Sequence, residues 1–222
     1  MPSKQSAANS AGIYNPASAA IASRWARRLN SLQDALLVVV SAVFFYYQAL
    51  GAIEGSAVNA GFAAEQAILV AMFLTRRRSR ATSARPIEWL IAAGGWLPLL
   101  ARPHEADSSL AIAGAITQVG GLGLTCAAML SLGRSFGVVA ANRGLKVHGL
   151  YRLVRHPVYL AHTVTFIGFV MANPTPWNAS IGITTLAVQV LRMRAEERVL
   201  AATSEYDDYR KQVRWRLLPG VY

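Results

Sequence analysis

The chain has 222 residues, of which 54% are hydrophobic and only 15% are charged, and its formal net charge is +11. This apolar fraction is high for a soluble domain, and the single cysteine, Cys126, excludes an intramolecular disulfide. The basic excess alone does not separate a nucleic-acid-binding protein from a membrane protein, so the positions of the basic residues must decide.

The apolar residues form blocks. Residues 1–30 are rich in Ala, Ser and Asn and indicate a mobile tail. The blocks that follow are 32–50, 56–74, 87–101, 108–132, 158–172 and 177–191. A helix rises about 1.5 Å per residue, and about 20 residues cross a hydrocarbon core. We therefore expect an all-α polytopic membrane helix bundle with about six transmembrane helices.

The basic residues follow the same pattern. If the N-terminus is cytoplasmic, all but one of the 22 Lys and Arg residues lie in segments expected on the cytoplasmic side, and the exception is Arg102. This bias fits the positive-inside rule. It predicts an integral membrane protein with both termini in the cytoplasm, and it explains the net charge without nucleic acid.

Polar residues crowd the start of the fifth apolar block, in the stretch YRLVRHPVY. Pro157 suits the first turn of a helix, and the N–H groups and dipole of a helix N-terminus favour an anion. Arg152 and Arg155 could therefore grip a carboxylate or phosphate. Alternatively, they anchor the helix at lipid headgroups, and Tyr159 belongs to an aromatic belt.

A second charged stretch, LRMRAEERVL, directly follows the sixth block. Glu196 and Glu197 lie at the expected negative end of a helix dipole, where carboxylates need cationic partners or a continuing helix. Arg192 precedes Glu196 by four residues, and Arg194 precedes Glu197 by three, so pairing along one helix is available. The stretch is either a salt-bridged helix extension or a site in which Arg192 holds an anionic substrate group.

The motif NPTP at residues 173–176 joins the last two blocks and predicts an antiparallel helical hairpin. Such a hairpin returns both charged stretches to one membrane face, where they and the C-terminal tail could form a pocket. We therefore divide the chain into a tail at 1–30, a four-helix membrane region at 31–132 and a pocket-forming region at 133–222.

Together these motifs resemble the isoprenylcysteine carboxyl methyltransferase family and its phospholipid methyltransferase relatives. The resemblance covers about residues 130–222, and Leu150 and Ala161 replace the usual Pro and Gly. The matching residues are Gly149, Tyr151, Arg152, Arg155, His156, Pro157, Tyr159, Glu196, Glu197, Leu200, Glu205, Tyr206, Tyr209 and Pro219.

The resemblance implies an integral-membrane methyltransferase that uses S-adenosylmethionine and acts on a lipophilic acceptor at the cytoplasmic face. It places Arg192 and Glu196 at the acceptor carboxylate and implies no metal site. It also implies that a set of residues binds the cofactor, namely His148, Gly149, Tyr151, Arg155, His156, Tyr159 and Glu197. The expected partners are the acceptor and membrane lipids.

The acceptor and two rival functions stay open. O-methylation of a carboxylate needs no base, whereas an amine acceptor must lose a proton, for which Glu196 is the candidate base. Membrane sterol reductases share an Arg-His-Pro-x-Tyr stretch but use NADPH. A non-enzymatic protein that binds a lipid headgroup is the other alternative.

Five further polar residues stand out. Glu65 lies near the middle of the second block and is either functional or a packing device. Glu88 is expected to be a helix-start charge only, and His162 is expected to pack rather than react. Tyr206 and Tyr209 belong to a tail that either lies on the membrane or closes over the cofactor.

Overall fold

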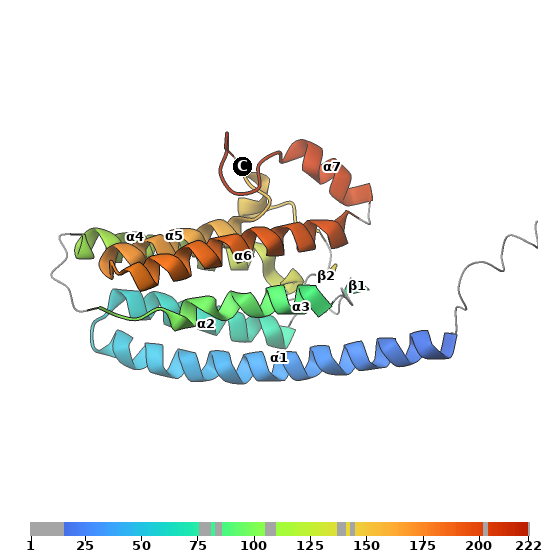
Figure 1. Ribbon diagram of the computed structural model, residues 1–222, viewed down its shortest axis with the longest axis horizontal. Coiled ribbons are helices and arrows are strands. Elements are labelled where there is room, and N and C mark those ends of the chain that lie inside the picture. The colour runs from blue at the N-terminus through green and yellow to red at the C-terminus, as the bar shows by residue number, and fades with distance from the viewer. Residues whose placement is uncertain are drawn as a thin grey trace, which may run out of the picture. The chain divides into compact units, whose positions relative to one another are not determined.

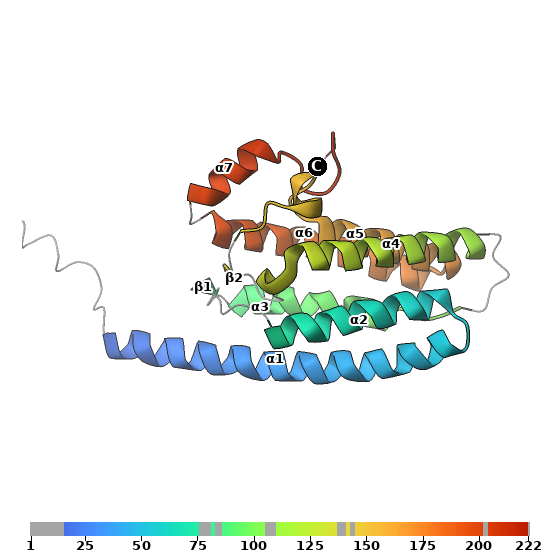
Figure 2. The same ribbon diagram turned by 180° about the vertical axis from the view of Figure 1, so that it is seen from behind.

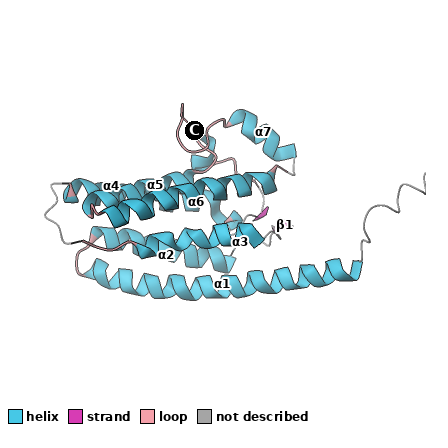
Figure 3. Ribbon diagram, in the orientation of Figure 1, coloured by secondary structure: helices cyan, strands magenta, loops and turns pink. Residues whose placement is uncertain are grey.

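A computed structural model of the chain describes residues 16–75, 81–82, 86–104, 110–136, 141–142, 145–201 and 204–221. The chain divides into two compact units, Met1–Leu37 and Val38–Tyr222. Its regular structure is almost wholly helical, which confirms the predicted all-α class (Figure 3).

Each of the six predicted apolar blocks is helical over most of its described residues. The α-helices are α1 (Pro16–Ile53), α2 (Ala57–Thr75), α3 (Pro86–Ala93), α4 (Ala111–Leu132), α5 (Pro157–Ala172), α6 (Pro176–Leu200) and α7 (Ser204–Gln212). The 3-10 helices are η1 (Gly94–Leu100), η2 (Gly133–Ser135) and η3 (Gly149–Arg152). One two-residue pair of strands, β1 (Ala81–Thr82) and β2 (Ala141–Asn142), is antiparallel.

Two boundaries differ from the prediction. Helix α1 begins at Pro16, inside the segment expected to be a tail, and residues 1–15 of that tail lie outside the described residues. The third block changes from α3 to the tighter η1 before Pro98, because proline lacks the N–H that an α-helix interior needs.

Three helices are long and apolar enough to cross a membrane, over Ala35–Ile53, Ala57–Thr75 and Ala111–Ser135. Leu90–Leu100 and Pro157–Ala172 are apolar but shorter. Large apolar side chains such as Ile112 and Ile183 are exposed, as expected for helices that face hydrocarbon. These features suit an integral membrane protein, but length and composition do not establish the predicted count of six spans.

Helices α4, α5 and α6 lie side by side, and α2 and α3 pack against this layer (Figures 1 and 2). The contact between α4 and α5 is close because both helices have glycine there. A Cβ on Gly121 would lie 2.5 Å from the backbone N of Thr165, and a Cβ on Gly168 would lie 2.4 Å from the backbone N of Gln118. Gly121 of α4 and Gly168 of α5 therefore allow the two helices to pack closely.

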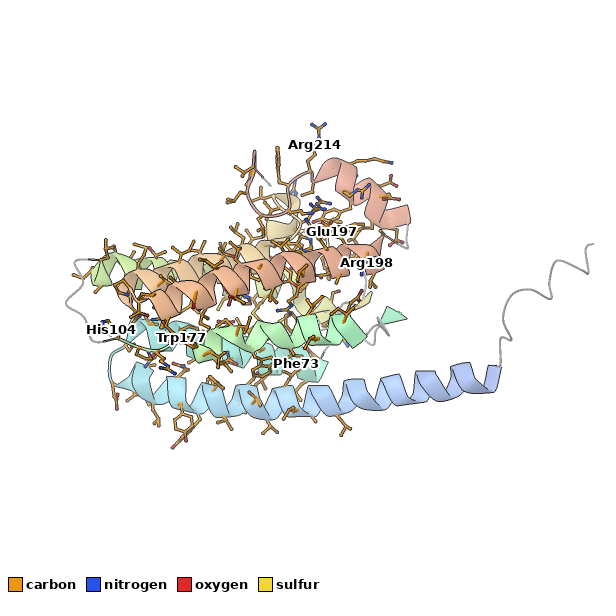
Figure 4. All side chains as sticks on the ribbon, in the orientation of Figure 1. Phe73, His104, Trp177, Glu197, Arg198 and Arg214 are labelled. Atoms are coloured by element: carbon orange, nitrogen blue, oxygen red, sulfur yellow. The ribbon has the colours of Figure 1, made fainter. Side chains whose placement is uncertain are left out.

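Helix α6 is fixed at both ends. Near its start, the buried Asn178 side chain bonds to the backbone N and O of Arg102, at 3.0 and 2.9 Å. Near its end, Arg198 donates to Glu88 on α3. Glu88 is only 3% exposed, so the expectation that it is merely a helix-start charge is wrong. Figure 4 shows Trp177 and Arg198 at opposite ends of α6, with Glu197 beside Arg198.

Candidate functional site

The hairpin of α5 and α6 brings the two charged stretches together. Helix α5 ends at Ala172 and α6 begins at Pro176, where the Thr175 hydroxyl caps the helix by accepting from the backbone N of Asn178 at 3.1 Å. The return of α6 then sets Oε1 of Glu197 3.2 Å from Nε2 of His156. The predicted hairpin and its shared polar end are therefore confirmed.

Glu197 is the centre of this end of the hairpin. Its carboxylate accepts from Arg216 Nε and Nη2, the latter at 2.8 Å, and lies 3.2 Å from Nη1 of Arg155. We call Arg155, His156, Glu197 and Arg216 the Glu197 cluster. Three of its members are buried, and Arg216 is partly buried. A buried carboxylate with several charge-assisted partners is a strong structural link.

The environment of Glu197 favours its charged form. Burial by itself would raise the pKa of the Glu197 carboxyl. The hydrogen bonds from His156 and Arg216 and the nearby charges of His156 and Arg155 outweigh burial, so the pKa lies well below its usual value. Glu197 is therefore an anion that holds three cationic or polar partners at neutral pH.

The C-terminal tail closes over the start of α5. The backbone N of Arg155 donates to Trp215 O, and the backbone N of His156 donates to Arg216 O, both at 2.9 Å. The hydroxyl of Tyr209 on α7 donates to Tyr151 O at 2.7 Å. Tyr206 and Tyr209 are both buried, so the tail packs on the protein and does not present these rings to a membrane surface.

A second group of side chains lies beside the Glu197 cluster. The hydroxyl of Tyr159 donates to Glu196 at 3.4 Å, and Nδ1 of His156 lies 3.8 Å from the same Glu196 oxygen. The Arg192 guanidinium lies over the Tyr159 ring, 5.4 Å from its centroid. A Cβ on Gly95 would lie 2.6 Å from Arg192 Nη1, so the absence of a side chain there leaves room for this guanidinium.

The structure resolves the two readings of the Arg-His-Pro stretch. Arg155 is buried and points to Glu197, and Tyr159 points to Glu196, so neither serves as a lipid anchor. Arg152 is exposed, which suits the anchoring alternative. The predicted site residues that come together are Arg155, His156, Tyr159, Arg192, Glu196 and Glu197.

The remaining predicted cofactor residues lie in and just before η3. His148 and Gly149 are exposed, and Tyr151 is buried. Gly149 has φ of +61°, and a Cβ there would lie 2.5 Å from Ser131 Oγ, so glycine is required for the turn. The Tyr151 backbone is tied to the tail by Tyr209, which connects this segment to the Glu197 cluster.

The cluster has unused capacity to bind a polar group. The Nε of Arg155 is buried and has no hydrogen-bond partner among the residues that the structure describes, whereas the buried hydroxyl of Tyr206 interacts with Glu197 and Arg155. Buried polar atoms normally have partners. A ligand carboxylate, such as that of an amino acid moiety, fits this Arg155 donor.

Sequence reasoning missed Arg216. The signal was a basic residue just before the late Leu-Leu-Pro of the tail, but nothing in its spacing connects it to Glu197, 19 residues earlier. Arg194, which the sequence offered as a partner of Glu197, instead lines an apolar groove of about 400 Å³ with Leu160, Leu186 and Leu217. Glu197 takes its partners from α5 and the tail.

A bundle of apolar helices with a buried cluster of arginine, histidine and carboxylate at one end defines a membrane protein with a polar site. Residues 110–205, from α4 to the start of α7, match the model of the phospholipid methyltransferase family. This segment of the chain is thus a phospholipid methyltransferase family domain, which confirms the resemblance seen in the motifs. It indicates a membrane methyltransferase that acts on lipid. No curated protein matches the chain.

Proposed function

We propose that the chain is an S-adenosylmethionine-dependent methyltransferase whose reaction takes place at the end of the α5–α6 hairpin. The observation that carries this proposal is the meeting of His156 with Glu197 and of Tyr159 with Glu196, inside the segment that matches a methyltransferase family. The cofactor would supply a methyl group on a sulfonium, which is already activated for transfer. The protein then has to bind, align and dehydrate the reactants.

The cofactor side of the site is proposed to be the Glu197 cluster with η3. Arg155 Nε offers a donor to the amino acid carboxylate of the cofactor. His156, Tyr159 and Glu197 form the wall toward α6, while His148, Gly149 and Tyr151 form the wall toward the loop before α5. Glu197 acts mainly by holding these segments and the tail in place, since its carboxylate is already bonded to Arg216, Arg155 and His156.

The acceptor side is proposed to be Arg192 with Glu196. The guanidinium lies against Tyr159, and Tyr159 bonds to Glu196, so the three side chains are fixed relative to one another. Arg192 can hold an anionic group of a lipophilic acceptor that enters from the bilayer. The family resemblance implies that this anion is a carboxylate that itself receives the methyl group. The chemical form of the methylated product tests that implication.

The site is also proposed to face the cytoplasm. Arg192, Glu196 and the tail lie at the end of the chain's helices where the Lys and Arg residues are concentrated, and the positive-inside rule assigns that end to the cytoplasm. The nearby Arg134 adds a bond across this end, from its Nε to Thr75 O at 2.6 Å.

Cofactor binding separates the candidates. Purified protein in detergent is titrated by calorimetry with S-adenosylmethionine and, separately, with NADPH. Binding of the first compound alone is expected. Binding of NADPH alone favours the reductase alternative, for which the family match gives no support, and binding of neither favours a lipid-binding protein without activity. The variant Glu197→Gln is expected to bind S-adenosylmethionine more weakly, whereas Glu205→Gln, at an exposed glutamate of α7, is the matched control.

A further inference from the structure

A second polar pair lies deeper in the bundle. Glu65 is in the middle of α2 and is only 8% exposed. Its Oε1 lies 3.3 Å from Nε2 of His162 on α5. Both helices are apolar, and an ionisable pair inside apolar helices is costly and is retained mainly for function. This pair has no part in the Glu197 cluster.

The pair adjoins the acceptor side of the proposed site. His162 follows Tyr159 by three residues on α5, so their Cβ atoms are neighbours on one helix face, about 5–6 Å apart. Tyr159 in turn contacts Arg192 and Glu196. The polar surface of α5 thus continues from the proposed acceptor site to His162.

The two side chains differ in exposure in a way that suits acid–base chemistry. The Glu65 side chain is 11% exposed, whereas the His162 side chain is 38% exposed. A proton on Nε2 donated to Glu65 leaves the lone pair of the ring on Nδ1. A buried carboxylate behind a more accessible imidazole is the arrangement that orients a general base.

Charged and titratable groups from the neighbouring helices are few. From α4, Cys126 lies within electrostatic reach of Glu65. On α5, Tyr159 is one turn from His162, and Arg192 of α6 lies against Tyr159. Glu196 accepts from that tyrosine at 3.4 Å, whereas His162 has the buried Glu65 carboxylate beside it to balance a positive charge.

We propose that His162 accepts the proton that the acceptor loses when it is methylated, and that Glu65 is the positioning residue that holds the imidazole. This inference rests on the proposed methyltransferase function. In the step, the acceptor's N–H or O–H nucleophile forms a bond to the methyl carbon, and the C–S bond breaks with its electron pair going to sulfur. The proton passes to His162 Nδ1, and the imidazolium is balanced by the Glu65 carboxylate. The acceptor therefore carries a proton on its reacting atom, so this proposal replaces the carboxylate acceptor that the family resemblance implies, and Arg192 then holds a different anionic group of the acceptor lipid.

The variant His162→Gln separates this role from helix packing. The Gln amide nitrogen can take the place of Nε2 and keep the hydrogen bond to Glu65, but the amide is no base at neutral pH. A general base contributes about 10²–10⁴-fold to a rate, so His162→Gln is expected to lower kcat at least 100-fold. Its Tm and its affinity for S-adenosylmethionine are expected to be unchanged. Glu65→Gln is expected to lower kcat less, with KM for the acceptor unchanged.

The assay uses full-length protein in vesicles of mixed phospholipid extract with methyl-labelled S-adenosylmethionine. The matched control is His104→Gln, at an exposed histidine outside the helices. After transfer, the labelled lipid is treated with mild alkali, which releases methanol from a methyl ester but leaves an N-methyl or ether O-methyl group attached. We expect the label to resist mild alkali. We also expect a large loss of kcat in His162→Gln but not in the His104→Gln control.

Two results would overturn the assignment. One is the release of the label as methanol in mild alkali. Such release identifies a methyl ester, and the carboxylate from which it forms has no proton to give to His162. The other is a His162→Gln variant with kcat within a few-fold of the wild type, since the pair would then serve packing only. Both results leave the proposed function intact, whereas a wild-type protein that transfers no label contradicts the proposed function itself.

Discussion

Replacing Glu197 by Gln removes the one negative charge that three partners share, while the size of the side chain is kept. The variant would leave two buried partners without this negative charge, namely Arg155 (8% exposed) and His156 (5% exposed). Breaking a buried ion pair from one side costs about 3–5 kcal/mol. The Arg216 side chain is 31% exposed, so solvent weakens its electrostatic interaction with Glu197. We therefore expect Glu197→Gln to lower the free energy of unfolding by about 3 kcal/mol, near the lower end of that range.

That loss is measurable as a shift in thermal unfolding. For a chain of this size, each kcal/mol lowers Tm by about 2–4 °C, so Glu197→Gln is expected to unfold about 6–12 °C below the wild type in the same detergent. A double-mutant cycle with Arg216→Ala is expected to give a coupling free energy of about 1–3 kcal/mol.

The control for this series is Glu205→Gln, whose side chain is exposed and whose effect is expected to stay within about 0.5 kcal/mol. If Glu197→Gln unfolds at the same temperature as Glu205→Gln, the carboxylate does not hold the hairpin and the tail together, and the argument for the Glu197 cluster fails.

Three further outcomes are expected. Gly121→Ala forces α4 away from α5 and should lower the free energy of unfolding by about 1–3 kcal/mol. The control is Gly120→Ala, where a Cβ meets nothing within 4 Å and no destabilisation is expected. Equal effects of the two variants on Tm would contradict the packing argument. Tyr209→Phe leaves Tyr151 O without its donor and should cost about 1–3 kcal/mol and speed proteolysis of the tail; an unchanged cleavage rate would show that the tail is held elsewhere. Because the pKa of Glu197 is lower in the folded than in the unfolded state, its stabilisation is complete above the unfolded value of about 4.3 and is lost as the pH falls from there toward the folded value. The Tm difference between wild type and Glu197→Gln should therefore shrink below about pH 4.3, and a constant difference would refute the assignment.

The local features of the hairpin were predictable because they depend on neighbours in sequence. Pro157 and Pro176 mark the starts of α5 and α6, and NPTP leaves room only for a tight turn. Given the hairpin, the helix lengths bring the two charged stretches to the same end of the molecule, but they do not determine that His156 meets Glu197.

The parts that sequence reasoning missed depend on contacts between distant segments. Arg216 reaches Glu197 only because the tail folds back and pairs its backbone with residues 155 and 156. His162 meets Glu65 from nearly 100 residues away, across α2 and α5, and no periodicity within either helix encodes that meeting. Glu88 was misjudged for the same reason, since its partner Arg198 lies at the far end of the chain.

The most direct test of the account follows a labelled methyl group from S-adenosylmethionine into the lipid fraction, with the wild type compared with Arg192→Gln and with the exposed control Arg210→Gln. The account predicts label in a lipophilic product for the wild type and the control, and a strong loss for Arg192→Gln while cofactor affinity is retained. If the wild type places no label in lipid although it binds the cofactor, or if Arg192→Gln transfers label as fast as the control, the end of the α5–α6 hairpin is not the site of methyl transfer.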